Sequence, residues 1–270
     1  MDLYERTSYE LANKFTSLYS TSFYLSSSLF PSTTRKHIYA IYGMVRIADE
    51  IVDSYRGADA EKILLDFEKE IYGCLEQSFS TNPVLHAFAK TSQQYGINET
   101  LITPFFESMR SDLSKRSFTQ EEYSKYIYGS AEVVGLMCLK VFAESDEHVY
   151  AELETGARAL AAAYQKVNFL RDIKTDFTEL GRVYFPNVTY EKFDTEAKRL
   201  IEQDIAHDFT VAKNAINKLP KNARRAVRAS YFYYFALFEK LKRASPEHIM
   251  NSRIRVSNTR KIFLLFKAWA

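Results

Sequence analysis

The chain has 270 residues, with 36 Lys and Arg against 34 Asp and Glu, and a net charge of +2 at pH 7. This balance argues against a general nucleic-acid binder, and two distant cysteines, Cys74 and Cys138, form neither a metal-ligand pattern nor a disulfide framework. With 8 Gly, 6 Pro and long stretches of helical periodicity, we predict one all-α domain over residues 1–270.

Residues 1–19 predict a first helix that is charged and lacks the apolar core of a signal peptide. The apolar side of this helix is expected to carry Leu3, Tyr4, Leu11 and Phe15. The chain contains no uninterrupted run of about 18 apolar residues, so we expect no membrane span and a cytoplasmic protein.

A second helix is predicted to follow Pro31 and to end near Ser54. It carries a polar stripe with the spacing i, i+4, i+7 and i+11, made up of Tyr42, Arg46, Asp49 and Asp53. Successive residues are about 100° apart on an α-helix, so these side chains fall within about 60° of one another. Their neighbours are apolar, which predicts a largely buried helix with one polar face.

Three amphipathic helices are predicted over residues 59–113, and Asp112 follows Arg110 near the end of the third. We interpret Asp112 as part of an ion pair or a helix end, outside the functional site. The next helix, over residues 119–142, contains small residues that admit either another helix or a substrate chain close to its backbone. These residues are Gly129, Ala131 and Gly135.

A long helix beginning at Asp146 carries a second polar stripe, made up of Gln165, Asn168, Asp172 and Asp176. Its spacing confines the four side chains to about 80°. One DxxxD pattern alone usually marks a solvated helix face, but two such stripes with apolar flanks predict a shared cavity if their helices face each other. Buried carboxylates are costly unless they are paired or hold a metal. This set of oxygen ligands suits Mg²⁺, with Mn²⁺ as the alternative, together with a diphosphate.

The segment Gly181–Pro186 is interpreted as a flap. Its Arg182 is placed to close over a diphosphate, because an arginine has a permanent charge and a rigid fork of donors; an exposed loop arginine is the alternative. Two further helices are predicted over residues 194–219 and 221–243. The C-terminal part interleaves apolar residues with five cations, and such a basic amphipathic helix either packs on the domain or lies on an anionic membrane surface. The cations are Arg253, Arg255, Arg260, Lys261 and Lys267.

Two stretches, SFYLSSSLFPSTTRKHIYAIYGMVRIADEIVD and YQKVNFLRDIKTDFTELGRVYFP, closely resemble the two signature regions of the squalene/phytoene synthase family. The segment MRSDLSKRSFTQEEYSKYIYGSAEVVGLMCLKVF resembles its central region. The resemblance runs from about Ser20 to about Pro186 and continues more weakly to the C-terminus. Details such as ADEIVD and QKVNFLRDIKTD are similar to bacterial phytoene synthases.

This resemblance implies the all-α isoprenoid synthase fold, a single domain with a central cavity lined by two facing acidic-motif helices. It also implies a Mg²⁺-dependent transferase of carotenoid biosynthesis that joins two geranylgeranyl diphosphates head to head. One substrate loses its diphosphate, and its carbocation attacks the double bond of the other. The cyclopropylcarbinyl (prephytoene) diphosphate that forms then ionises and rearranges to phytoene, with no reductant expected.

The resemblance also implies residue roles. Metal binding is expected from Asp49, Asp53, Asn168, Asp172 and Asp176. Arg46 is expected to contact diphosphate and to act with the four aspartates in catalysis, and Gln165 and Asn168 are expected at the substrate, beside the Arg182 already placed there by its charge. The hydrocarbon channel or its polar mouth is expected to include Phe23, Tyr42 and Tyr128.

Three departures from the family pattern concern the shape of the cavity more than its metal chemistry. Thr175 stands where many members have an acid, but it lies about 100° from Asp176, so the missing acid need not be a ligand. The loop over residues 177–182 is one residue longer than usual, and Glu132 replaces a common glycine.

Three alternatives share this fold. A squalene or dehydrosqualene synthase would use farnesyl diphosphate, in the squalene case with a nicotinamide reductant. A prenyl-diphosphate hydrolase would let water capture the cation. A non-enzymatic assembly factor of the same fold would have degraded acidic motifs, which the four retained aspartates argue against. For localisation, peripheral contact with the inner face of the cell membrane is the alternative to a purely cytoplasmic protein.

Overall fold

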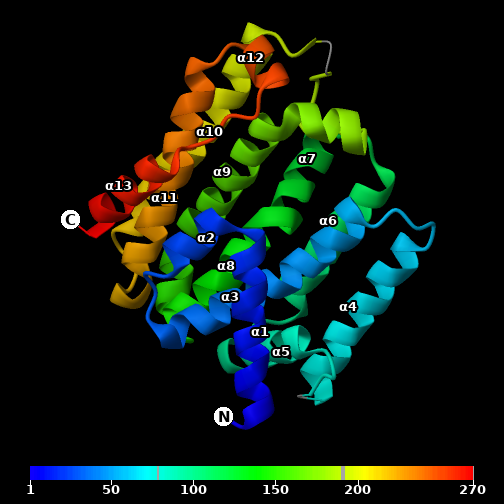
Figure 1. The fold of residues 1–270 in the computed structure, drawn as a ribbon, viewed down its shortest axis with the longest axis vertical. Helices are drawn as coiled ribbons and strands as arrows, with labels where there is room; N and C mark the ends of the chain where they lie inside the picture. Colours follow the sequence, from blue (N-terminus) through cyan, green and yellow to red (C-terminus); the bar gives the residue numbers. More distant parts are fainter. Residues whose placement is uncertain (78, 190–191, 270) are drawn as a thin grey trace.

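The computed structural model describes residues 1–77, 79–189 and 192–269. This part of the chain is helical, and its one extended pairing is an isolated bridge between Ser117 and Val183. The predicted all-α class is confirmed (Figure 1). The helices are α1 (Leu3–Tyr19), α2 (Thr21–Ser27), α3 (Ser32–Asp49), η1 (Glu50–Ser54), α4 (Ala60–Gln77), α5 (Pro83–Tyr95), α6 (Glu99–Ser114), α7 (Gln120–Ile127), η2 (Tyr128–Glu132), α8 (Val133–Ala143), α9 (Glu147–Leu180), α10 (Thr195–Ile216), α11 (Lys221–Arg243), α12 (Pro246–Asn251) and α13 (Asn258–Trp269).

The 34-residue helix α9 organises the fold. The carboxylate of Asp146 caps its first turn, and Gly181 ends it in the left-handed conformation at φ 67°. Helices α8, α10, α11 and α12 and the segment η2 all pack against it. In Figure 1, α9 runs between the C-terminal helices α10 and α11 and the helices α7 and α8. Its inward face is therefore surrounded by protein along most of its length.

Two segments, η1 and η2, are π-helical and directly continue α3 and α7. In η1 the amide of Tyr55 donates to the carbonyl of Glu50 at 3.0 Å, which closes a wider turn than that of an α-helix. Such turns cost helical regularity and are frequent at functional sites. Here η1 carries Asp53, so this irregularity falls on the first predicted acidic stripe.

The buried side of α1 differs from the predicted one. Ser8, Ala12 and Thr16 are fully buried, whereas Leu3 is 71% and Leu11 43% exposed. The reason is close packing against α3 and α5, since small side chains let helix backbones approach one another. The prediction is therefore wrong for Leu3 and Leu11, whereas Tyr4 and Phe15 are half-buried.

The run Gln120–Ala143, which comprises α7, η2 and α8, is the one described helix that is long and apolar enough to cross a membrane by length and composition. The sequence had predicted no such segment. However, 61% of the relevant window is buried inside the protein, and the core helix of a soluble protein passes the same test. The run packs against α6 and α9, and Leu136, Met137 and Leu139 belong to the main core.

Candidate active site

The first acidic stripe lies where α3 passes into η1. Asp49 is the last residue of α3, and Asp53 lies one turn later in η1. Nη1 of Arg46 is 3.6 Å from Oδ2 of Asp49, and its Nη2 contacts the carboxylate of Glu50. The stripe therefore presents a carboxylate pair with an arginine on its flank, as the spacing predicted.

The second stripe lies in the second half of α9. Asp172 accepts a hydrogen bond from Nε of Arg171 at 2.9 Å, and its Oδ1 lies 3.0 Å from Nε of Arg253. Arg253 comes from the segment between α12 and α13, 81 residues further along the chain. Asp176 lies one turn beyond Asp172 and faces the same space.

The four carboxylates of the two stripes line one cavity of about 470 Å³, which we call the acidic cavity. Asp49 and Asp53 enter it from α3 and η1, and Asp172 and Asp176 enter it from α9. The helices that carry the stripes thus face each other, and the four carboxylates converge as the sequence predicted.

Crowding and burial change the acidity of two of these carboxylates. Burial, together with nearby Asp53, raises the pKa of Asp49 to about 7, although Arg46 acts in the opposite direction. Burial and the charge of Asp172 raise the pKa of Asp176 to about 8. Both shifts mean that negative charge in the acidic cavity is incompletely neutralised by the arginines around it.

Arg182 is buried, with 4% of its surface exposed, so the alternative of an exposed loop arginine is wrong. Its Nη1 lies 2.7 Å from Oδ1 of Asp53, and its Nη2 donates to the carbonyl of Val52 at 2.9 Å. The backbone amide of Arg182 also donates to the carbonyl of Asp176. One flap residue therefore ties the end of α9 to η1.

Asp112 is a site residue that the sequence interpretation missed. It is 3% exposed and accepts hydrogen bonds from the hydroxyls of Tyr126 at 2.8 Å and Tyr184 at 3.0 Å. Its Oδ1 lies 3.5 Å from Nη1 of Arg182, and burial raises its pKa to about 6. A signal was present: Asp112 is seven residues after Phe105, so the acid falls on the apolar face of α6.

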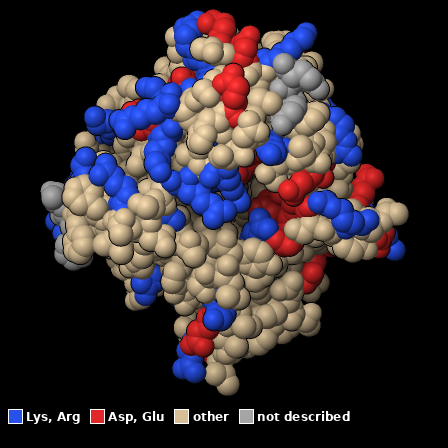
Figure 2. All heavy atoms as spheres, turned by 45° about the horizontal axis from the view of Figure 1, so that its top comes forward, with Lys and Arg blue, Asp and Glu red and all other residues tan. Residues whose placement is uncertain are grey.

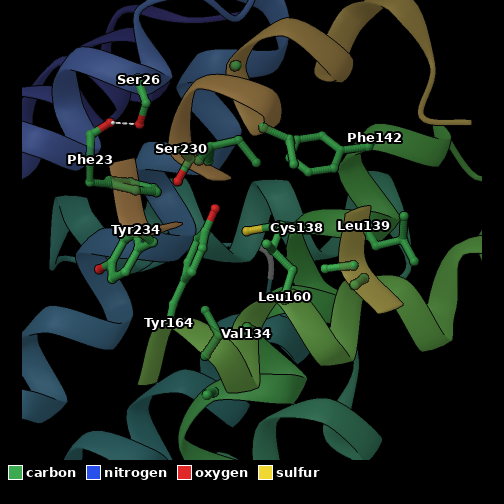
Figure 3. A pocket seen from close by; sticks show the side chains of 18 of the residues that line it. Phe23, Ser26, Val134, Cys138, Leu139, Phe142, Leu160, Tyr164, Ser230 and Tyr234 are labelled. Carbon is green, nitrogen blue, oxygen red and sulfur yellow. Dashed lines mark hydrogen bonds between the residues drawn. The ribbon is translucent and has the colours of Figure 1, made fainter. Parts of the chain in front are cut away.

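A second cavity, of about 310 Å³, is almost entirely apolar, and we call it the apolar cavity. Figure 3 shows the rings of Phe23 and Tyr234 on one side and Phe142 on the other, with the hydroxyl of Tyr164 pointing into the space between them. Tyr42 also lines it, at 5.0 Å centroid distance from the stacked ring of Phe23. Phe23 and Tyr42 therefore lie on the wall of this cavity.

Gln165 and Asn168 join the two cavities, because both residues line the acidic cavity and the apolar cavity. Oδ1 of Asn168 is buried and has no hydrogen-bond partner in the described structure. A buried amide oxygen without a partner is costly unless a ligand satisfies it. Asn168 therefore offers a free amide oxygen to a ligand at the junction of the two cavities.

A third cavity, of about 790 Å³, borders the same junction and is lined by Phe23, Tyr42 and Asn168 as well as by several cations; we call it the basic cavity. The cations come from α3, α9 and the C-terminal segment, and Figure 2 shows Lys and Arg side chains gathered beside a hollow bordered by Asp and Glu. They are Arg46, Arg171, Arg253, Arg255 and Lys261.

Tyr128 is not among the described residues that line these three cavities. Its ring lies 5.2 Å from the guanidinium of Arg158, whose Nε is 2.6 Å from Oε2 of Glu132. Glu132, which stands where a glycine is common in the family, is thus held by an ion pair with Arg158. The structure does not bring Tyr128 together with the other predicted site residues.

The small residues after Tyr128 serve both of the predicted uses. A Cβ at Gly129 would lie 2.1 Å from the carbonyl oxygen of Pro104, so this position needs glycine for the close approach of α6. Ala131 and Gly135 line the apolar cavity, where their small size leaves room, and a Cβ at Gly135 would also lie 2.8 Å from the Cβ of Ala161 on α9.

The donor set of the acidic cavity fits divalent cations that share it with a ligand. Among residues 1–77, 79–189 and 192–269, no three His, Cys, Asp or Glu side chains are arranged to hold one metal ion together. Mg²⁺ needs only one or two carboxylates and takes its remaining positions from water and phosphate. Paired aspartates with raised pKa values and the unpartnered oxygen of Asn168 meet that requirement.

Comparison with known proteins adds the following. Residues 16–260 match the family described as squalene/phytoene synthase. The chain is 27% identical to the phytoene synthase of Arthrospira platensis, covering 96% of this chain and 91% of that protein. It is 28% identical to the 15-cis-phytoene synthase of a Synechocystis strain, covering 97% and 84%. The crystal structure of a dehydrosqualene synthase superimposes with a TM-score of 0.82 at 21% identity, covering 98% of this chain and 96% of that one.

Proposed function

The chain belongs to the squalene/phytoene synthase family, whose members are prenyltransferases, and we propose that it joins two geranylgeranyl diphosphates head to head to give phytoene and diphosphate. The observation that carries this proposal is the junction at Asn168, where the acidic, basic and apolar cavities meet. A prenyl diphosphate matches this combination of charged and apolar cavities, because it has an anionic head and a long apolar chain. The similarity to two phytoene synthases supports the longer substrate.

Charge on the leaving diphosphate must be neutralised as its carbon–oxygen bond breaks. We assign Asp49, Asp53, Asp172 and Asp176 to hold divalent cations, Mg²⁺ in the first place. When bound, these would supply Lewis-acid stabilisation of the leaving group. The carboxylates act as pairs on two rigid helices, so their separation is set before substrate arrives.

The basic cavity supplies a second place for phosphate oxygens. Arg46 lines both the acidic and the basic cavity, and so do Arg171 and Arg253. A guanidinium offers planar pairs of donors that match phosphate oxygens. Two diphosphates could thus lie side by side at the junction, as a reaction between two identical substrates requires.

The apolar cavity protects the carbocation that remains. Water would convert this cation to a prenyl alcohol, so the surrounding wall must keep water out. The faces of Phe23, Tyr42 and Tyr164 border this space and can stabilise positive charge without reacting with it. Burial raises the pKa of the Tyr164 hydroxyl well above its usual value, so this group stays neutral.

The test is a product assay with purified protein, Mg²⁺ and either farnesyl or geranylgeranyl diphosphate, with and without a nicotinamide reductant. Mass spectrometry then identifies the hydrocarbon. The proposal expects a C40 product from the longer substrate without reductant. A C30 product would assign the protein to the squalene branch, and a prenyl alcohol alone would assign it as a hydrolase. No turnover of either substrate with Mg²⁺ or Mn²⁺ would favour the non-enzymatic alternative.

A further inference from the structure

Helix α13 has two dissimilar faces. Leu264 and Ala268 are 4% and 0% exposed on the side that packs against α11. On the opposite side Ile262, Phe263 and Phe266 are 50%, 56% and 72% exposed. Figure 1 shows α13 and α11 side by side at the edge of the fold. From the sequence, packing on the domain and contact with a membrane were alternatives. In the described part of α13, the buried face packs on the domain and the opposite, exposed face is free for membrane contact.

The C-terminal stretch that carries this exposed face has charged residues of a single sign. Residues 251–270 contain five Arg and Lys and no Asp or Glu, in a protein whose total charge is almost balanced. The guanidinium of Arg260 lies 5.3 Å from the ring of Phe263, and Nζ of Lys267 lies 4.9 Å from the ring of Phe232 on α11. On the helix, Arg260 and Lys267 lie about 40–60° beyond Phe263, at one edge of the apolar face.

We propose that the exposed face of α13, made up of Ile262, Phe263 and Phe266 with Arg260 and Lys267 beside them, docks on the surface of a membrane that contains anionic lipid. A helix with aromatic residues on one face and cations at its border inserts its apolar side at the level of the headgroups and attracts anionic lipid. A second copy of the chain is a poorer occupant, because a symmetric contact would bring equal positive charges together.

The position of α13 next to the basic cavity suggests what membrane docking would achieve. Arg253, Arg255 and Lys261, from the same C-terminal stretch, line the basic cavity. Docking would therefore hold one wall of that cavity near the lipid surface, where amphiphilic diphosphates and apolar products partition. Lipid binding itself does not require the proposed reaction, so the two are tested separately.

The experiment measures sedimentation of the full chain with vesicles of phosphatidylcholine, with and without phosphatidylglycerol, at low and high salt. We expect binding that needs the anionic lipid and weakens with salt. Phe263→Ala with Phe266→Ala should reduce the partition coefficient about tenfold or more. Leu3→Ala with Leu18→Ala is the matched control, since these side chains on α1 are 71% and 69% exposed, and it should bind as the parent does.

A second variant, Arg260→Gln with Lys267→Gln, keeps the aromatic face and should lower the dependence on anionic lipid and on salt. Circular dichroism confirms that each variant is folded. Three results would overturn the proposal: no binding of the parent chain, equal losses in the α1 and α13 variants, or a lipid-free dimer in sedimentation velocity that the Phe263→Ala and Phe266→Ala changes dissociate.

Discussion

Nη1 of Arg182 lies 2.7 Å from Oδ1 of Asp53, although 129 residues separate the two in the sequence. This contact fastens the flap after α9 to the π-helical turn after α3. The same guanidinium is 3.5 Å from Asp112, so one buried arginine is shared between two carboxylates that line the acidic cavity.

Replacing Arg182 with methionine should destabilise the protein by about 3 kcal/mol or more, because it leaves the buried carboxylate of Asp112 without its cation. Urea unfolding measures this difference. Arg6→Met is the control, since Arg6 pairs with Glu10 on the surface, where both side chains are largely exposed. Equal stability of the two variants would show that the Arg182 pair contributes little.

Asp49→Asn and Asp172→Asn should each lower turnover at least about a hundredfold, because each removes a charge assigned to metal binding. Unfolding without metal should require at least as much denaturant for Asp49→Asn as for the parent, since the amide ends its repulsion with Asp53. Asp66→Asn on the exposed face of α4 is the control. Full turnover in both site variants would contradict the metal assignment.

Arg253→Gln should raise the KM for the diphosphate substrate about tenfold, with a smaller change in kcat, because a charged donor to phosphate is lost from the wall of two cavities. Steady-state kinetics separates the two constants. Lys218→Gln, at an exposed pair with Glu152, should leave both unchanged. An unchanged KM for Arg253→Gln would place the diphosphates elsewhere.

Acid should destabilise the fold through His37, which is buried between Tyr9 and Thr91. Burial, with a smaller effect of Lys36, lowers its pKa from 6.5 to about 4. The unfolded chain therefore binds the proton first, and stability falls as the pH drops from about 6.5 towards 4. His37→Gln should flatten that part of the curve of unfolding free energy against pH, and an equal slope in both proteins would contradict this account.

Gly156→Ala should destabilise α9 by about 1–3 kcal/mol, because a Cβ there would lie 2.1 Å from the Cβ of Ala215. Gly73→Ala makes the same chemical change inside α4, where nothing lies within 4 Å, and should stabilise the protein by about 0.5–1 kcal/mol. Thermal unfolding compares the two. A shift of the same sign in both would rule out the contact between α9 and α10 as the cause.

The sequence by itself determined the features that depend on local periodicity. The stripes of Asp49 with Asp53 and of Asp172 with Asp176 were predicted because helix geometry sets which side chains share a face. The all-α class followed from the same regularity, since few Gly and Pro interrupt it. The resemblance in these stretches also identified the family, which the match over residues 16–260 confirms.

Tertiary structure alone decided which charges are buried and what they contact. Arg182 lies in a loop, where nothing local distinguishes it from a surface residue. Asp112 falls on the apolar face of α6, but that position alone does not identify its partners. Contacts with Asp53, Tyr126 and Tyr184 from other segments stabilise the two buried charges. In α1 the small residues face inward because α3 and α5 approach closely. Burial of a charge or choice of a helix face depends on the energy of partners distant in sequence, which no local pattern contains.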